Sequence, residues 1–253
     1  MCNLYSVMRG RAEIVAQVRA MDRNNNQPPM PGVYPDYEAP VVVNAAGGGR
    51  EMRNMRWGMP SPKNLLMDAA GKRADALRKK GTEVDFAELL RMEPDKGVTN
   101  VRNTTSVKTG RLNAHWAPWL GPAHRCLVPF SSFAEPDQDH EGSRKNIWFA
   151  LGPGRPLAMF AGVWTPHACV RAKSKGWEEI EVYAFLTTEP AEPVKTYHRK
   201  AMPAILTRDS EWDLWLSGAP WGEVAHLQRP LADGALTIVA MGTRLDDVPL
   251  TAG

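Results

Sequence analysis

Short apolar or alternating runs, each bounded by proline, glycine or aspartate, dominate the chain after residue 98. They are rich in β-branched and aromatic residues and lie at positions 126–133, 147–151, 157–164 and 180–188. Such runs predict β-strands, because branched and aromatic side chains pack well on a pleated surface. The strands do not alternate regularly with helices, so we expect an α+β domain and not a doubly wound parallel sheet.

Helical periodicity is confined to a few segments. Residues 11–23 repeat apolar side chains at helical spacing, which predicts a first helix. Trp212 and Trp215 have the same spacing within residues 210–218, and we expect both rings in the core. A closing strand is predicted at residues 235–241, after this last helix.

A β-hairpin is predicted between residues 39 and 60. The β-branched run Val41–Val43 forms its first strand, and a glycine-rich turn follows at residues 47–49. The second strand then ends near Trp57. The hairpin therefore brings two strands together early in the chain.

Residues 61–97 are rich in lysine and arginine and predict a charged helical insertion. Residues 82–92 predict a helix capped by Thr82, with Asp85 three residues on as in a capping box. The stretch 67–81 predicts a solvated helical face. No linker is long enough to divide the chain, so we expect one domain over residues 1–253, with its core at about 2–240.

Charge and cysteine content narrow the class of protein. The net charge of +3 permits a polyanionic partner without requiring one. The three cysteines, Cys2, Cys126 and Cys169, follow no zinc-ligand or disulfide spacing. We therefore expect no metal site, and we expect the protein to be located in a reducing cytoplasm. The first twenty residues lack the apolar core of a signal peptide, and no apolar run is long enough to span a bilayer.

Reactive residue types occur in four separate segments. They are Cys2, Asn100, Glu135 and His198, the last three in strand-like or apolar surroundings. A structural role is the simpler interpretation of each one alone. Together they supply a thiol, an amide that can orient it, a carboxylate and an imidazole, which is the set expected for nucleophilic chemistry on a carbonyl.

The order of several short motifs resembles the SRAP family (SOS response-associated peptidase). The motifs are MCNLYS, MRWGMP, TNVRN, RCLVPFSSFAE, AGVWTP, LTTEP and HRKAMPAIL, and they run from the first residue to about residue 239. The resemblance implies a single domain of curved, mainly antiparallel sheets with a barrel-like core and a few flanking helices. Asn3 and Leu4 stand where the family more often has glycine and arginine.

The resemblance also implies roles for the four reactive residues. Cys2 matches the residue that bonds covalently to abasic sites in single-stranded DNA, after Met1 has been removed autocatalytically. Asn100 matches the asparagine that holds this cysteine, Glu135 matches the active-site glutamate, and His198 matches the histidine beside the opened sugar. On this basis the protein forms a thiazolidine crosslink that shields the lesion during the DNA damage response.

Further positions match DNA-contacting residues of the family. They are Pro40, Arg56, Trp57, Arg102 and Thr187, with Arg102 on the DNA backbone and Trp57 packed against a base at the lesion. The expected partner is therefore single-stranded DNA that contains abasic sites. We expect a cytoplasmic monomer that needs no cofactor and no membrane.

Two other functions are compatible with the residues alone. The first is a single-stranded DNA-binding module that forms no covalent bond, in which Cys2 is incidental. The second is a thiol peptidase that acts on other proteins, for which Cys2, His198 and Asn100 are suitable residue types. A covalent adduct with an abasic oligonucleotide distinguishes the crosslinking function from both.

Overall fold

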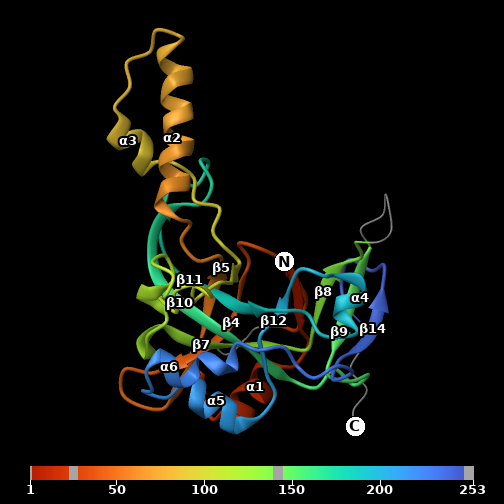
Figure 1. Cartoon of the computed structure of the whole chain (residues 1–253). Coiled ribbons are helices and arrows are strands. Elements are labelled where there is room, and N and C mark those ends of the chain that lie inside the picture. The colour runs from red at the N-terminus through yellow and green to blue at the C-terminus, as the bar shows by residue number, and fades with distance from the viewer. Residues whose placement is uncertain (1, 23–27, 139–144, 248–253) are drawn as a thin grey trace.

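The computed structural model describes residues 2–22, 28–138 and 145–247 (Figure 1). Its helices are α1 (Arg11–Val18), α2 (Lys63–Arg78), α3 (Phe86–Arg91), α4 (Val194–Tyr197), α5 (Asp209–Trp215) and α6 (Trp221–Val224), with short 3-10 turns at Ala117–Trp119, Pro122–His124 and Ala225–Leu227. Its strands are β1 (Leu4–Val7), β2 (Ala20–Asp22), β3 (Met30–Val33), β4 (Glu38–Asn44), β5 (Arg50–Trp57), β6 (Asn100–Val101), β7 (Arg125–Phe130), β8 (Ser132–Pro136), β9 (Asn146–Ala150), β10 (Ala158–Val170), β11 (Trp177–Thr188), β12 (Met202–Pro203), β13 (Ile205–Leu206) and β14 (Thr237–Met241).

A closed barrel forms the centre of the fold. Strands β5, β4, β7, β10 and β11 are neighbours in this order, and a parallel pairing of β11 with β5 closes the ring. The other pairings within the ring are antiparallel. At Gly162 on β10 an added Cβ would lie 2.7 Å from the Sγ of Cys126 on β7, so this close approach requires glycine. The expected α+β fold with a barrel-like core is confirmed.

A second sheet carries the start of the chain. Its order is β14-β9-β8-β1-β3, so β1 lies between β8 and β3. Leu4 pairs with Ala134, and this register places the residues before β1 beside the end of β8. Figure 1 shows the N-terminal end of the described chain between the barrel and this sheet. The two sheets thus bring the first residues to an interior position.

The helices differ from the sequence-based expectation in their limits. The helix expected over residues 11–23 ends at Val18, because Ala20–Asp22 pairs with β5 as strand β2. Trp212 and Trp215 on α5 are 2% and 0% exposed, as expected for core residues. None of the helices within the described ranges is long and apolar enough to cross a membrane.

Helices α2 and α3 form an arm that projects from the barrel (Figure 1). The predicted cap of α3 was wrong: the N-cap is Asp85, whose carboxylate accepts hydrogen bonds from the backbone N–H groups of Ala87 and Glu88. Thr82 lies before the helix. Since α2 has only Ala70 and Ala74 fully buried, its charged surface is solvated, as the sequence predicted.

Candidate active site and nucleic-acid interface

Cys2 is buried at the junction of the two sheets. Its side chain is 0% exposed, and its Sγ lies 3.5 Å from the carbonyl oxygen of Leu4 and 3.8 Å from that of Ala134. Asn100 on β6 donates from Nδ2 to the Cys2 carbonyl at 2.8 Å and holds the residue from the other side. Met1, whose removal the family resemblance implies, lies outside the described residues.

Glu135 and His198 complete the cluster around Cys2. Glu135 lies on β8 and is 0% exposed, and His198 follows α4 and is 2% exposed. The Nε2 of His198 lies 3.5 Å from the Oε2 of Glu135. The Glu135 carboxyl also interacts with the Cys2 thiol. The structure therefore brings together the four reactive residues from four separate segments of the sequence.

Burial keeps this cluster uncharged. It raises the pKa of the Glu135 carboxyl to about 8 and lowers the pKa of the His198 imidazole to about 4. Burial, and next the charge of Glu135, raise the pKa of the Cys2 thiol. At neutral pH the carboxyl and the thiol hold their protons and the imidazole is neutral, so a proton can move between them without creating an isolated buried charge.

Sequence reasoning missed Gln138, which contacts His198. The Nε2 of Gln138 lies 3.0 Å from the Nδ1 of His198, and the two residues are 60 positions apart in the chain. Nothing in the local sequence marks Gln138, because its partner is determined by how α4 returns to β8. The contact places Gln138 directly behind the imidazole.

The two arginines expected at DNA are both paired with acidic residues. Arg56 donates to Glu178 at 3.0 Å and lies 3.9 Å from Asp36. Arg102 donates to Glu189 at 2.5 Å and also to the backbone carbonyl of Lys200. Arg102 is partly exposed at the edge of a groove of about 500 Å³. A phosphate could replace the carboxylate partner of Arg102 there.

The other expected DNA contacts are less exposed. Thr187 lines the same groove as Arg102 but is 1% exposed, and Pro40 on β4 is buried. Trp57 is 0% exposed, with its ring stacked on Phe185 at 5.1 Å and its Nε1 donating to the carbonyl of Thr99 at 2.9 Å. The assignment of Trp57 to a DNA base is corrected: it is a core residue, because the pairing of β5 with β11 encloses it.

The structure exposes a tyrosine that the sequence analysis did not single out, Tyr37. Tyr37 is 52% exposed and lies in the turn between β3 and β4, where its carbonyl accepts from the N–H of Trp57 at 2.9 Å. Since Tyr5 pairs with Val33 in antiparallel register, the turn that follows Val33 lies beside the first residues of the chain. The Tyr37 ring packs edge-on against that of Tyr34 at 5.6 Å, which leaves the rest of its surface exposed.

A sequence model of the family described as SOS response associated peptidase (SRAP) matches residues 1–248. The chain belongs to the SRAP family. This membership supports a role associated with DNA damage and an interaction with DNA, and it is consistent with a peptidase-like or DNA-processing activity. A search of the curated proteins found no match.

Solved structures share the fold of this SRAP chain. A protein from Bordetella bronchiseptica matches with a TM-score of 0.60 and 19% identity, over 93% of this chain and 97% of that one. A protein from Bacteroides thetaiotaomicron matches with a TM-score of 0.58 and 20% identity, over 93% of this chain and 90% of that one. At such identities the likeness concerns the fold alone.

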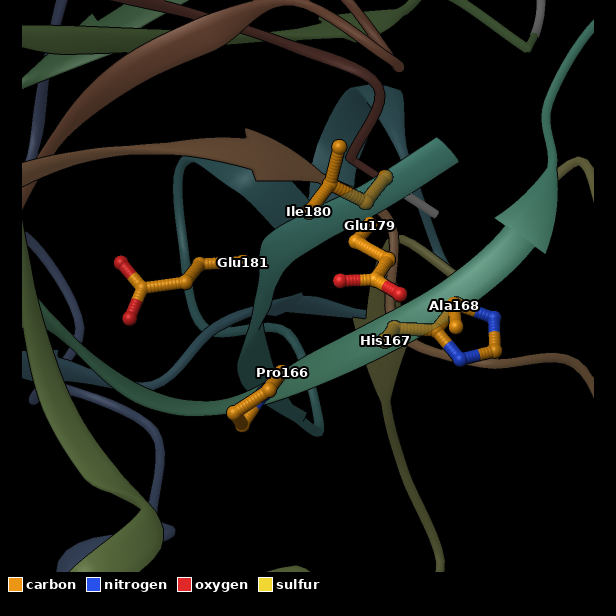
Figure 2. Close-up of a pocket in the computed structure, with 6 residues that line it drawn as sticks. All are labelled: Pro166, His167, Ala168, Glu179, Ile180 and Glu181. Carbon is orange, nitrogen blue, oxygen red and sulfur yellow. The ribbon is translucent and has the colours of Figure 1, made fainter. Parts of the chain in front are cut away.

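A second pocket of the SRAP chain lies away from the reactive cluster. It has a volume of about 460 Å³ and lies along β10 and β11, where Figure 2 shows the side chains of Glu179 and Glu181. His167 also lines this pocket, and Glu181 is paired with Arg53 at 2.8 Å, so the lining carries groups of both charges. Within the part of the chain that the structure describes, no group of three or more His, Cys, Asp or Glu residues could hold a metal ion.

Proposed function

We propose that this protein recognises abasic sites in single-stranded DNA and forms a thiazolidine crosslink through Cys2, after autocatalytic removal of Met1. The crosslink would shield the lesion during the DNA damage response. The observation that carries the proposal is the convergence of Cys2, Asn100, Glu135 and His198 in one buried cluster. An N-terminal cysteine matches an aldehyde, because its amine and its thiol can both add to the same carbon.

The chemistry balances without a further reactant. The opened abasic sugar presents an aldehyde, and the α-amine of Cys2 condenses with it to give a Schiff base and one molecule of water. The thiol then adds to the imine carbon while its proton passes to the nitrogen, which closes a five-membered ring. An α-amine with an ordinary pKa of about 7.7 to 8.0 is partly unprotonated at neutral pH.

The site supplies protons for both steps. Because burial raises its pKa to about 8, Glu135 carries a proton that it can give to the departing hydroxyl group of the carbinolamine. The resulting carboxylate lies beside the Cys2 thiol and can accept the proton of the thiol. Asn100 holds the Cys2 carbonyl and so orients the amine. His198 acts on the sugar oxygen during ring opening.

DNA binding combines phosphate contacts with stacking. Arg102 would exchange Glu189 for a phosphate at the groove edge, with Thr187 lining the same groove. Arg56 and Pro40 would contact the DNA elsewhere. Tyr37, which is 52% exposed, would take the stacking role that the family resemblance implied for Trp57. Stacking on an aromatic ring contributes roughly 1 to 3 kcal/mol per base and tolerates any sequence, as recognition of damage requires.

The decisive experiment is the intact mass of the protein after incubation with an abasic single-stranded oligonucleotide. We expect a stable adduct that lacks Met1, and no such adduct with Cys2→Ala. Cys2→Ser keeps the amine, so a Schiff base trapped by borohydride should persist while the thiazolidine is lost. Tight binding without an adduct would support a non-covalent binding module, and cleavage of added proteins would support an external peptidase.

Tyr37→Ala tests the interface. It should weaken binding to single-stranded DNA by about the stacking energy of one base, roughly 1 to 3 kcal/mol, and Tyr37→Trp should restore it. The matched control is Trp177→Ala, which removes another exposed aromatic ring, 44% exposed and packed against Arg91 on the arm. Equal losses in the two variants would exclude a specific role for Tyr37.

A further inference from the structure

Gln138 binds both sides of the segment that carries His198. Its backbone N–H donates to the carbonyl of Tyr197 at 3.0 Å, and its side-chain Oε1 accepts from the backbone N–H of Arg199 at 3.3 Å. Its side-chain Nε2 lies 3.0 Å from the Nδ1 of His198. These contacts fix the orientation of the amide relative to the ring.

The backbone N–H of Arg199 decides which end of the amide faces which partner. A backbone N–H can only donate, so the oxygen of the Gln138 amide must face it. The amide nitrogen is then left for the imidazole, and an amide NH₂ group can also only donate. The Nδ1 of His198 must therefore accept, which leaves the proton of the neutral ring on Nε2.

We propose that Gln138 is a positioning residue that holds His198 as the Nε2–H tautomer, so that the neutral imidazole enters the reaction as a hydrogen-bond donor through Nε2. Nε2 is the ring nitrogen that faces the Oε2 of Glu135 at 3.5 Å. In this arrangement Glu135, after it has given its own proton to the departing hydroxyl group, accepts the thiol proton. His198 donates a hydrogen bond to the ring oxygen of the sugar, which gains the proton that the C1 hydroxyl group loses as the ring opens. This assignment of roles rests on the proposed function, whereas the tautomer does not.

Several other groups face the His198 ring. Glu135 approaches from β8, and Lys200 adds positive charge. The carbonyl of Pro136 also lies against the ring and competes for its proton. Since burial lowers the pKa of His198 to about 4, the ring is neutral from pH 5 to 8 and its tautomer matters throughout.

Long-range ¹H–¹⁵N correlation spectra of the full chain at pH 7 test the tautomer directly. The spectrum of His198→Ala assigns the signals by their loss. We expect an unprotonated Nδ1 and a protonated Nε2 in the wild-type ring. A protonated Nδ1 overturns the proposal, and this result is obtained whether or not any DNA adduct forms.

Gln138→Glu, an almost isosteric substitution, tests whether the tautomer of His198 affects crosslinking. A carboxylate still accepts from Arg199 N–H but can only accept from the ring, so the proton should move to Nδ1. The added negative charge should also raise the pKa of His198 by about 1 to 3. With Cys2 exposed by an added protease, crosslinking at pH 7 should slow by at least tenfold and its pH profile should shift upward.

The matched control is Gln17→Glu, which makes the same charge change at an exposed position on α1. It should leave the spectrum of His198 and the pH profile unchanged. If Gln138→Glu folds poorly, Gln138→Met removes the donor without adding charge and should give a mixture of tautomers. Spectra and pH profiles of the Gln138 variants that match those of Gln17→Glu would overturn the proposal.

Discussion

His198–Glu135 and His167–Asp95 are histidine–carboxylate pairs of similar composition that hold their protons in opposite ways. In the first pair burial raises the pKa of Glu135 to about 8 and lowers that of His198 to about 4, so both partners are neutral at pH 7. In the second pair burial is outweighed: the pKa of Asp95 lies well below its usual range, and that of His167 is raised to about 9. The second pair is a true ion pair.

The difference follows from the groups around each carboxylate. Asp95 accepts from His167 Nε2 at 3.0 Å, and also from the backbone N–H groups of Gly97 at 2.9 Å and Ser61 at 3.1 Å. Glu135 faces a thiol and a neutral imidazole instead. Fixed backbone donors stabilise a charge in the interior and make the His167–Asp95 pair structural. Glu135, held neutral by burial, remains able to exchange a proton.

The largest expected effect separates the two histidines by activity. With Cys2 exposed by an added protease, His198→Ala should slow crosslinking by about 100- to 10,000-fold, the usual loss for one proton-transfer group. His167→Ala should leave the rate per folded molecule unchanged, because His167 is bonded to Asp95 and not to the reactive cluster. Single-turnover rates from intact mass check both. Similar losses in both variants would contradict the comparison.

For the stability of the fold, the His167–Asp95 pair should matter more than the His198–Glu135 pair. Asp95→Asn removes the charge that His167 and two backbone donors stabilise, and His167, whose pKa burial alone lowers, then loses its proton. Loss of such charged hydrogen bonds costs about 1.5 to 3 kcal/mol of unfolding free energy. Urea unfolding monitored by tryptophan fluorescence measures it. A loss below that of an ordinary surface substitution would mean that the pair is not structural.

These two pairs also mark the limits of sequence-based inference here. Glu135 and His198 were predicted because short motifs around them resemble a family. The His167–Asp95 pair was not predicted, because its members are 72 positions apart and join a loop to β10. Gln138 was missed for the same reason.

Local sequence patterns predicted where strands form better than they predicted which side chains the fold buries. The apolar runs after residue 98 became strands, since period and composition determine strand formation locally. The family resemblance placed Trp57 against a DNA base, but the closure of the barrel between β5 and β11 buries its ring. Burial of this kind depends on pairing between distant strands, which local sequence does not encode.

A smaller effect concerns the pH dependence of stability. The pKa of Glu135 rises from an ordinary 4.5 to about 8 on folding, so the folded chain holds more protons than the unfolded chain in that window. The protonated Glu135 carboxyl therefore contributes its full stabilisation below pH 4.5, and this stabilisation is lost as the pH rises through about 8. Glu135→Gln removes this loss, so it should be more stable than the wild type at pH 8 by on the order of a few kcal/mol.

The comparison to make is the difference in Tm between Glu135→Gln and the wild type, measured from pH 5 to pH 8. It should grow in favour of the variant as the pH rises. A difference that stays constant with pH would mean that Glu135 does not change its proton affinity on folding. The same variant should retain Met1 in intact mass if Glu135 drives self-processing.

The smallest expected effect comes from a carboxylate that resembles Asp95 in its donors but lies in water. Asp85 accepts from the backbone N–H groups of Ala87 and Glu88 at the start of α3, on the exposed arm. Loss of such a cap costs about 1 kcal/mol, because water can accept hydrogen bonds from the exposed backbone N–H groups that the side chain no longer binds. Asp85→Ala should therefore lower the unfolding free energy by that amount, less than the loss from Asp95→Asn, and leave crosslinking unchanged.

Hydrogen exchange at α3, compared with β10, locates the change. If Asp85→Ala destabilised the chain as strongly as Asp95→Asn, burial would not be what distinguishes the two carboxylates.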